Sequence, residues 1–267
     1  MKKIAGPIIV VLGLIFVYAP ILILAVYSFT DATTIGAIRG FSLSNYITLF
    51  TTPELGSMIW GTVALALVSS VLATILGTVG AIGSFYSDKR IGKTFGAANQ
   101  IPVVNADVVT AFSLCILLVV VLGVSKDTFI PLIIGHVVLS APFVYLSVTP
   151  KLKQMDSSLY EAALDLGASP AQALAKIIIP QIFSGIVSGF AMAITLSLDD
   201  YFIATYTKPA TFDTISTYVV NATRGSHTEI KTALWALSTV IFLIVLVVAI
   251  SMNLYRGKVK SEERSDA

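Results

Sequence analysis

The sequence is poor in charged residues. Asp, Glu, Lys and Arg make up 12% of its 267 residues, whereas an ordinary soluble domain contains about 25%. Its hydrophobic content is 56% and its mean hydropathy is +0.89. Most of the chain is therefore suited to lipid, and a net charge of only +2 gives no basis for binding nucleic acid.

Cysteine and histidine are scarce as well. Cys115 is the single cysteine, which excludes an internal disulfide and a cysteine-rich metal site. His136 lies in an apolar run and is interpreted as a hydrogen-bonded packing residue, with a proton relay as the alternative. No G-x-x-x-x-G-K-[ST] phosphate loop is present, and no spacing of ligands or nucleophiles indicates a metal or catalytic site. The chain is not expected to be an enzyme.

Six apolar runs are long enough to cross a bilayer, since about 20 residues suffice for one crossing. These runs are 7–29, 57–87, 97–124, 129–149, 177–206 and 232–255. The first is longer than the apolar part of a signal peptide and is expected to be retained. Gly185 and Gly189, with Ser184 and Ser188, predict that the fifth helix closely approaches another helix. The predicted fold is all-α, with residues 1–267 forming one transmembrane domain.

Basic residues predict the orientation of these spans. Of the 17 Lys and Arg residues, those on the side opposite the termini are Arg39, Lys126, Lys208, Arg224 and Lys231. Lys and Arg are enriched in cytoplasmic loops. Both termini are therefore predicted to be cytoplasmic, with residues 256–267 forming a polar cytoplasmic tail.

The polar segment 151–180, between the fourth and fifth runs, carries helix-start signals. Ser158 followed by Glu161 has the spacing of a capping box, which predicts a short helix from near Leu159. The helix is expected to present a small apolar stripe. Its members are Leu159, Ala162, Ala163 and Leu166.

Gly167 is placed to end this helix, and Ser169 with Pro170 to begin a second one that continues toward the membrane. The result is a two-helix elbow. A helix of about two turns is not stable alone, so the first helix needs a surface to pack on. That surface is either this chain itself or a partner protein.

The run Glu161-Ala162-Ala163, followed by Gly167 and then by Ile-Pro at 179–180, resembles the EAA motif of ABC importer permeases. The resemblance implies the type I permease fold in a bacterial inner membrane. It also implies that Glu161, Ala162, Ala163 and Gly167 form a coupling surface for a cytoplasmic ATPase. ATP and Mg would be bound by that ATPase, with no cofactor in this chain.

Three carboxylates lie within the apolar runs: Asp107 in the third, and Asp199 and Asp200 in the fifth. An ionised group in the bilayer centre costs at least about 2.5–3.5 kcal/mol, so such groups usually face a cavity or a partner. Pro102 and Asn105 predict a broken helix just before Asp107. The expected partner of these acids is a cation.

Each acid has a plainer interpretation, in which it meets water or caps a neighbouring helix. Adjacent helical residues project about 100° apart, so Asp199 and Asp200 are not expected to face a pathway equally, and Asp199 is favoured. The ring of Tyr201 suits an aliphatic cation, although aromatic residues also serve in helix packing.

The run Ser197-Leu198-Asp199-Asp200 and the run Asp107-Val108-Val109 resemble stretches of the PotC-type spermidine/putrescine permeases, although Asn105-Ala106 stands where Ser-Pro is expected. This narrower resemblance implies polyamine import, with Asp107, Asp199, Asp200 and Tyr201 along the substrate pathway. It also implies three partners: a second, PotB-like permease, two copies of a PotA-like ATPase and a PotD-like binding protein. The alternative is an ion-coupled secondary transporter or channel for a cation.

Overall fold

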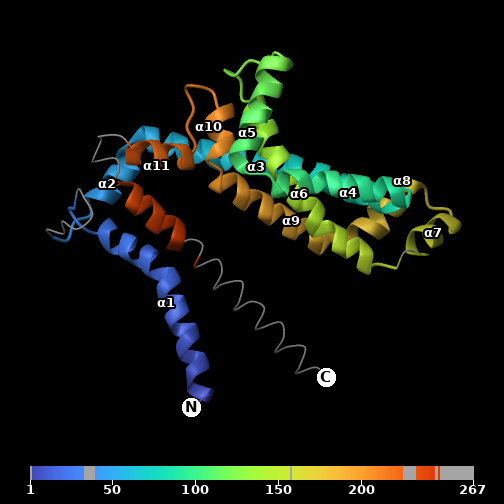
Figure 1. The fold of residues 1–267 in the computed structure, drawn as a ribbon, viewed down its shortest axis with the longest axis horizontal. Helices are drawn as coiled ribbons and strands as arrows, with labels where there is room; N and C mark the ends of the chain where they lie inside the picture. The colour runs from blue at the N-terminus through green and yellow to red at the C-terminus, as the bar shows by residue number, and fades with distance from the viewer. Residues whose placement is uncertain (1, 33–39, 157, 225–232, 244–245, 247–267) are drawn as a thin grey trace. The chain divides into compact units, whose positions relative to one another are not determined.

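The computed structural model describes residues 2–32, 40–156, 158–224, 233–243 and 246 (Figure 1). The contacts divide the chain into two compact units, one of residues 57–218 and one of residues 1–56 with 219–267. Regular structure in the described residues is helical, apart from an isolated bridge between Thr30 and Phe41. The prediction of an all-α fold is confirmed.

The smaller unit contains α1 (Lys2–Ser28), α2 (Ser44–Thr51) and a helix at Ala233–Leu243. The span of α1 from Ile9 to Ser28 leaves its apolar side chains exposed, as expected for a helix that faces lipid. The side-chain amide of Asn45 donates to the carbonyls of Ser28 and Thr30 at 3.1 and 3.0 Å. Asn45 therefore fixes α2 to the end of α1.

The larger unit, residues 57–218, contains the elements that carry the predicted sites, although α3 begins before it and α11 ends after it. In chain order they are α3 (Pro53–Tyr86), α4 (Lys89–Val104), α5 (Asp107–Cys115), η1 (Ile116–Val121), α6 (Ile130–Gln154), α7 (Ser158–Asp165), α8 (Pro170–Ala173), η2 (Leu174–Ile178), α9 (Ile179–Asp199), α10 (Phe202–Thr207) and α11 (Ile215–Arg224). Both η segments are π-helical turns within longer helices.

The core of the larger unit lies where α3 and α9 pack on α6 (Figure 1). Gly185 and Gly189 of α9 are buried there, so that the backbones of α6 and α9 come close. A Cβ on Gly189 would lie 3.0 Å from the Cα of Val144, and one on Gly185 3.0 Å from the carbonyl oxygen of Ser147. The predicted close approach of this helix is confirmed, and its partner is α6.

Four helices of the described residues are long and apolar enough to cross a membrane, or five if α4 and α5 with η1 form one bent span. The bend between them is 105°, which confirms the predicted break before Asp107. The helix leading to it begins at Lys89 and not near Ala97 as predicted. The sixth predicted span begins as Ala233–Leu243, and most of its remaining length, like the tail 256–267, lies outside the described residues.

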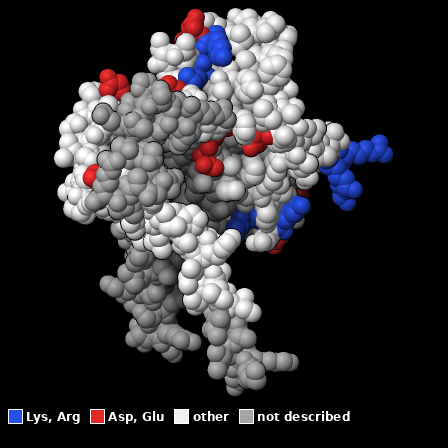
Figure 2. Space-filling view, turned by 60° about the vertical axis from the view of Figure 1, so that its left-hand side comes forward, with Lys and Arg blue, Asp and Glu red and all other residues white. Residues whose placement is uncertain are grey.

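Uncharged side chains cover most of the surface, and Lys and Arg gather in a few groups (Figure 2). Large apolar side chains such as Leu76 and Val79 of α3 are exposed. Exposed apolar surface of this extent is unfavourable in water but favourable in lipid. The surface therefore agrees with a membrane-spanning chain.

The α3–α6 contact predicts that alanine substitutions at two glycines of α3 will differ in their effect on stability. A Cβ on Gly77 would lie 2.7 Å from the carbonyl oxygen of Ala141, whereas one on Gly83 would meet nothing within 4 Å. We expect Gly77→Ala to destabilise the purified chain by about 1–3 kcal/mol through overpacking, and Gly83→Ala to be neutral or slightly stabilising. Thermal unfolding in detergent measures both variants, and equal melting temperatures would contradict the assigned packing.

Candidate coupling and transport sites

The elbow starts at an acidic residue that the sequence analysis did not single out. Asp156 accepts the backbone N–H of Ser158 at 3.0 Å and its hydroxyl at 2.8 Å. These two hydrogen bonds, the backbone one foremost, hold the pKa of the Asp156 carboxyl below its ordinary value. The predicted capping box of Ser158 with Glu161 is therefore wrong in its partner, because the Ser158 hydroxyl donates to the carboxylate of Asp156.

Gly167 ends α7 as predicted. Its φ is +85°, a conformation that strains other residues. The N–H of Gly167 donates to the carbonyl of Leu164 at 2.9 Å, and that of Ala168 donates to Ala163 at 3.0 Å. This pair of bonds is a Schellman motif, which satisfies carbonyls at the helix end.

Ser169 then begins the second helix, also as predicted. Its hydroxyl accepts the N–H of Gln172, and the Gln172 side chain accepts the N–H of Ser169 at 3.0 Å, which completes a capping box with Pro170 at the first helical position. From Pro170 the helix is continuous through α8, η2 and α9 to Asp199. The second helix of the elbow and the fifth span up to Asp199 therefore form one continuous helix.

Three of the four predicted coupling residues are exposed on the elbow: Glu161, Ala162 and Gly167. Ala163 is only 9% exposed, so it packs within this chain. Leu166, predicted to belong to the apolar stripe of this helix, is 89% exposed. The helix ends one residue before Leu166, so the side chain no longer follows the helical stripe. Leu166 therefore adds an exposed apolar side chain to the exposed residues of the elbow.

The elbow is also tied to α3. The rings of Tyr160 in α7 and Tyr86 at the end of α3 lie 4.9 Å apart, and Tyr160 packs against the core of α6 and α9. Aromatic pairs at this separation contribute about 0.5–1.5 kcal/mol beyond the area that they bury. The short α7 therefore has the packing surface that an isolated helix of its length needs.

The far end of α9 contains a second break. The fifth span was predicted to continue through Tyr206, but α9 ends at Asp199 and α10 begins at Phe202. Between them, the carboxylate of Asp200 accepts the N–H groups of Ile203 at 3.2 Å and Ala204 at 2.7 Å. A carboxylate at this position satisfies free N–H groups and the positive end of the helix dipole.

His136 of α6 faces this carboxylate. Its Nε2 lies 3.7 Å from Oδ2 of Asp200, and both side chains are buried. Its Nδ1 lies 2.9 Å from the carbonyl of Leu132 and is the donor, because a carbonyl oxygen only accepts. In the neutral imidazole, Nε2 would then present a lone pair to the carboxylate.

The prediction that His136 is a hydrogen-bonded packing residue is confirmed by its contact with Leu132. Its contact with Asp200 was not predicted. Residues so far apart in the sequence are brought together by the packing of α6 on α10, for which the local pattern carries no signal.

α5 and α10 pack side by side in the same direction. Ala111 shares a core cluster with Ile203. The ring of the next residue, Phe112, packs on that of Tyr206, and Cys115, one turn after Ala111, contacts the carbonyl of Tyr206. The two helices therefore run in parallel, with Asp107 at the first residue of α5 and Asp200 just before α10.

The predicted pathway residues do not share one environment. Asp107 is exposed at the first residue of α5, and Asp199 is exposed at the last residue of α9. Tyr201 is half-buried with its ring 5.3 Å from that of Phe202. Asp200, by contrast, is only 9% exposed. The two adjacent acids therefore differ in environment, with Asp199 exposed and Asp200 buried. The helical spacing predicted such a difference.

Basic side chains do not neutralise the two exposed acids. In the part of the chain that the structure describes, the acid–base contacts are His136 with Asp200 and Lys208 with Asp213, the latter at 3.0 Å. The described residues also contain no cluster of His, Cys, Asp and Glu that would hold a metal. The exposed carboxylates are available to a ligand.

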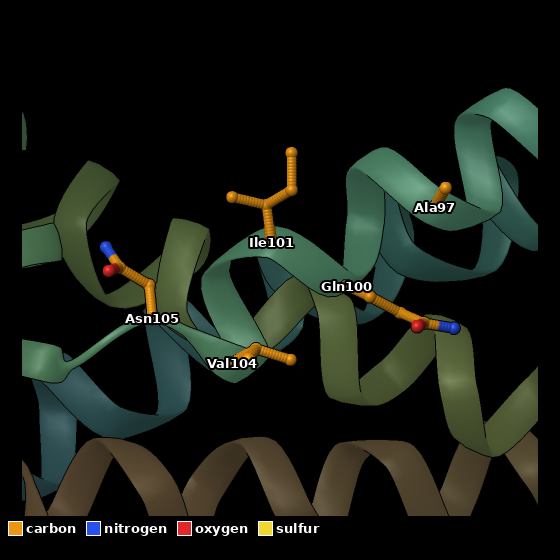
Figure 3. Close-up of a pocket in the computed structure, with 5 residues that line it drawn as sticks. All are labelled: Ala97, Gln100, Ile101, Val104 and Asn105. Atoms are coloured by element: carbon orange, nitrogen blue, oxygen red, sulfur yellow. The ribbon is translucent and has the colours of Figure 1, made fainter.

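A shallow hollow of about 550 Å³ precedes the bend at Asp107 (Figure 3). Its lining residues Ala97, Gln100, Ile101, Val104 and Asn105 follow one helix, with Asn105 at the end beside the break. The Asn105 amide donates to the hydroxyl of Thr110 at 2.9 Å. This bond spans the bend between α4 and α5 and helps to hold it.

Comparison with known proteins decides the family. Residues 99–261, more than half of the chain, match the model of the binding-protein-dependent transport system inner membrane component. The chain belongs to this family. It is accordingly a multi-pass inner-membrane transport subunit.

Relatives of this permease align over most of its length. It is 32% identical to the putrescine transport system permease protein PotI of Escherichia coli (strain K12), over 88% of this chain and 84% of PotI. It is 30% identical to the spermidine/putrescine transport system permease protein PotC of Haemophilus influenzae, over 88% of this chain and 90% of PotC.

The fold of the permease also matches solved transporters. A bacterial ABC transporter involved in the import of the acidic polysaccharide alginate superposes with a TM-score of 0.71 at 20% identity, over 94% of this chain and 93% of the other. This likeness shows the type I permease fold and, at such low identity, nothing about the cargo.

The separate environments of the paired acids of the permease predict unequal roles in stability. We expect Asp200→Ala to cost about 2 kcal/mol, because the buried N–H groups of α10 lose their acceptor. Asp199→Ala, at an exposed site, is expected to change stability by less than about 0.5 kcal/mol. Thermal unfolding of the two purified variants compares them. Equal destabilisation would show that Asp200 does not cap α10 as described.

Proposed function

We propose that this permease is one of two membrane subunits of an ATP-driven polyamine importer. The observation that carries the proposal is the pair of exposed carboxylates, Asp107 and Asp199, which have no basic partner among the described residues. The relatives named for putrescine and spermidine transport support the same cargo. An importer of an acidic polysaccharide has the same fold, so the cargo is argued from side chains and not from the fold.

The acids would bind the ammonium groups of the cargo. Each lies at a helix end beside a break, where irregular backbone is tolerated only against protein or a watery cavity. The half-buried ring of Tyr201, two residues beyond Asp199, would cover the methylene chain and attract an ammonium with its face. Asp200 supports this arrangement by holding α10 and facing Asp107, and it binds no cargo directly.

Energy would enter at the elbow. A separate ATPase would bind ATP and Mg, because this chain has no phosphate loop. Glu161, Ala162 and Gly167, with Leu166, would form the docking surface, and Ala163 would support it from within. The continuous helix from Pro170 to Asp199 has 30 residues and so spans about 45 Å. A movement of the elbow would therefore be carried directly to Asp199.

An importer of this kind would need three kinds of partner. A second permease would complete the pathway, two ATPase copies would dock on the paired elbows, and an external binding protein would deliver the cargo. A solved relative of the fold is described in complex with a periplasmic protein, which supports the last partner. The elbow and both termini would be on the cytoplasmic side, where ATP is available.

The cargo assignment is tested by replacing both exposed acids. We expect Asp107→Asn with Asp199→Asn to lower putrescine uptake about tenfold or more, since each lost charge-assisted contact is worth about 1.5–3 kcal/mol. Uptake of labelled putrescine into proteoliposomes containing the complete transporter is the measurement. Asp127→Asn, an exposed acid in the loop between η1 and α6, is the matched control. Unchanged uptake in the double variant would refute the charge argument.

The elbow is tested separately. We expect Glu161→Ala with Leu166→Ser to abolish co-purification of the ATPase and to remove putrescine-stimulated ATP hydrolysis, because the exposed contacts of α7 are lost. Gln154→Ala, exposed at the end of α6, is the control. If the variant still binds the ATPase and couples normally, the docking surface lies elsewhere. Uptake by this chain alone, driven by an ion gradient, would instead favour a secondary transporter.

A further inference from the structure

A second pocket lies between the end of α3, the start of α4 and the end of α6. Its volume is about 690 Å³, and its basic lining residues are Lys89, Arg90, Lys93 and Lys153. No Asp or Glu lines it. In the described part of the chain none of these four side chains contacts a carboxylate. The pocket therefore concentrates positive charge that no described carboxylate of this chain neutralises.

The floor of the pocket is rigid. The hydroxyl of Ser84 donates to the carbonyl of Gly92 at 3.2 Å and lies 3.0 Å from the hydroxyl of Tyr145. A Cβ on Gly92 would lie 2.7 Å from the carbonyl oxygen of Ser84, and one on Gly96 3.2 Å from the Tyr145 hydroxyl. The close approach of α4 to α3 and α6 thus fixes where the basic residues stand.

An apolar groove leads away from the basic end. Ala97 and Gln100 line both this pocket and the hollow of Figure 3, which continues to Ile101 and Val104. Ile101 and Val104 are 67% and 83% exposed. α4 has 16 residues and so extends about 24 Å, which exceeds the about 15 Å depth of one leaflet of the hydrocarbon core. The pocket is basic at one end, and the exposed side of α4 next to it is apolar. This arrangement suits a molecule with an anionic headgroup and an apolar chain.

The pocket lies at the same end of the larger unit as the elbow. Ser87 lines it, one residue after Tyr86, and Tyr86 packs on Tyr160 of α7. If α7 meets the cytoplasmic ATPase, as in the proposed function on which this step rests, the pocket opens at the cytoplasmic leaflet. That leaflet carries anionic lipid, and basic pockets between membrane helices on this side suit anionic headgroups.

We propose that this pocket binds an anionic phospholipid of the cytoplasmic leaflet. The headgroup phosphate lies among Lys89, Arg90, Lys93 and Lys153, and an acyl chain follows the apolar side of α4 toward Val104. Bound lipid neutralises the clustered charge and covers the groove up to the bend before Asp107. The site is separate from the exposed acids and from the docking surface of the elbow.

The test uses the complete transporter in nanodiscs of phosphatidylcholine, with and without phosphatidylglycerol. Native mass spectrometry measures how much phosphatidylglycerol is retained. Each basic residue near an anionic surface contributes about 1 kcal/mol, so Lys89→Gln with Lys93→Gln is expected to weaken retention about 30-fold. Lys126→Gln with Lys176→Gln, two exposed lysines outside the pocket, is expected to retain the lipid. Lys89→Arg with Lys93→Arg keeps the charge and is also expected to retain it.

Three results would overturn the proposal. The first is equal retention by the glutamine variant and the unaltered protein. The second is displacement of the lipid by soluble glycerol 3-phosphate, which would show a site for a free anion. The third is loss of the ATPase from the glutamine variant with lipid retention unchanged, which would assign the basic residues to a protein contact. Lipid retention is measured without any transport assay. The result can therefore be interpreted even if the proposed cargo or the proposed docking residues of the elbow are wrong.

Discussion

In lipid, every backbone N–H and C=O needs a partner within the protein, because an unpaired group costs several kcal/mol. Unbroken helices meet this requirement along their length. The breaks before Asp107 and after Asp199 do not. At the second break a side chain supplies the missing acceptors, and at the first a side-chain contact spans the bend. Asp200 accepts the free N–H groups of α10, and Asn105 donates to Thr110 across the bend of α4 and α5. The functional region is built where the backbone requirement is hardest to meet.

This repair explains why adjacent acids have different roles. Asp200 turns inward to α10 and His136, and it shares the neighbourhood of Asp107. Asp199 is the last residue of α9 and points out of the packed core. The buried carboxylate of Asp200 pairs with N–H groups of α10 and so stabilises the break. The same break leaves Asp199 exposed. The long helix that begins at Pro170 ends at this point, so in the proposed function a movement of the elbow would reach the same break.

Local sequence signals correctly predicted those structural features that depend only on residues close together in the sequence. Gly167 and Ser169 punctuate the elbow as expected, and Gly189 packs on α6. Where several groups compete, local reasoning failed. The hydroxyl of Ser158 bonds Asp156 and not the first turn of the helix, and Leu166 leaves the stripe because the helix ends before it. The His136–Asp200 contact depends on the packing of helices distant in sequence, which no local pattern contains.

The likeness to an alginate importer separates what the fold determines from what the side chains determine. The close packing of α6 on α9 needs only small residues, and the elbow needs only helix caps and a turn. Neither feature depends on the chemistry of the cargo. The charge of the cargo must be read by groups that the fold leaves unpaired, and here those groups are acidic. An acidic polymer would be repelled by Asp107 and Asp199, whereas a polyamine would replace the counterions that these carboxylates otherwise draw from water. In the proposed function, selectivity would therefore reside in a few side chains at helix ends, which can change without disturbing the helix packing beneath them.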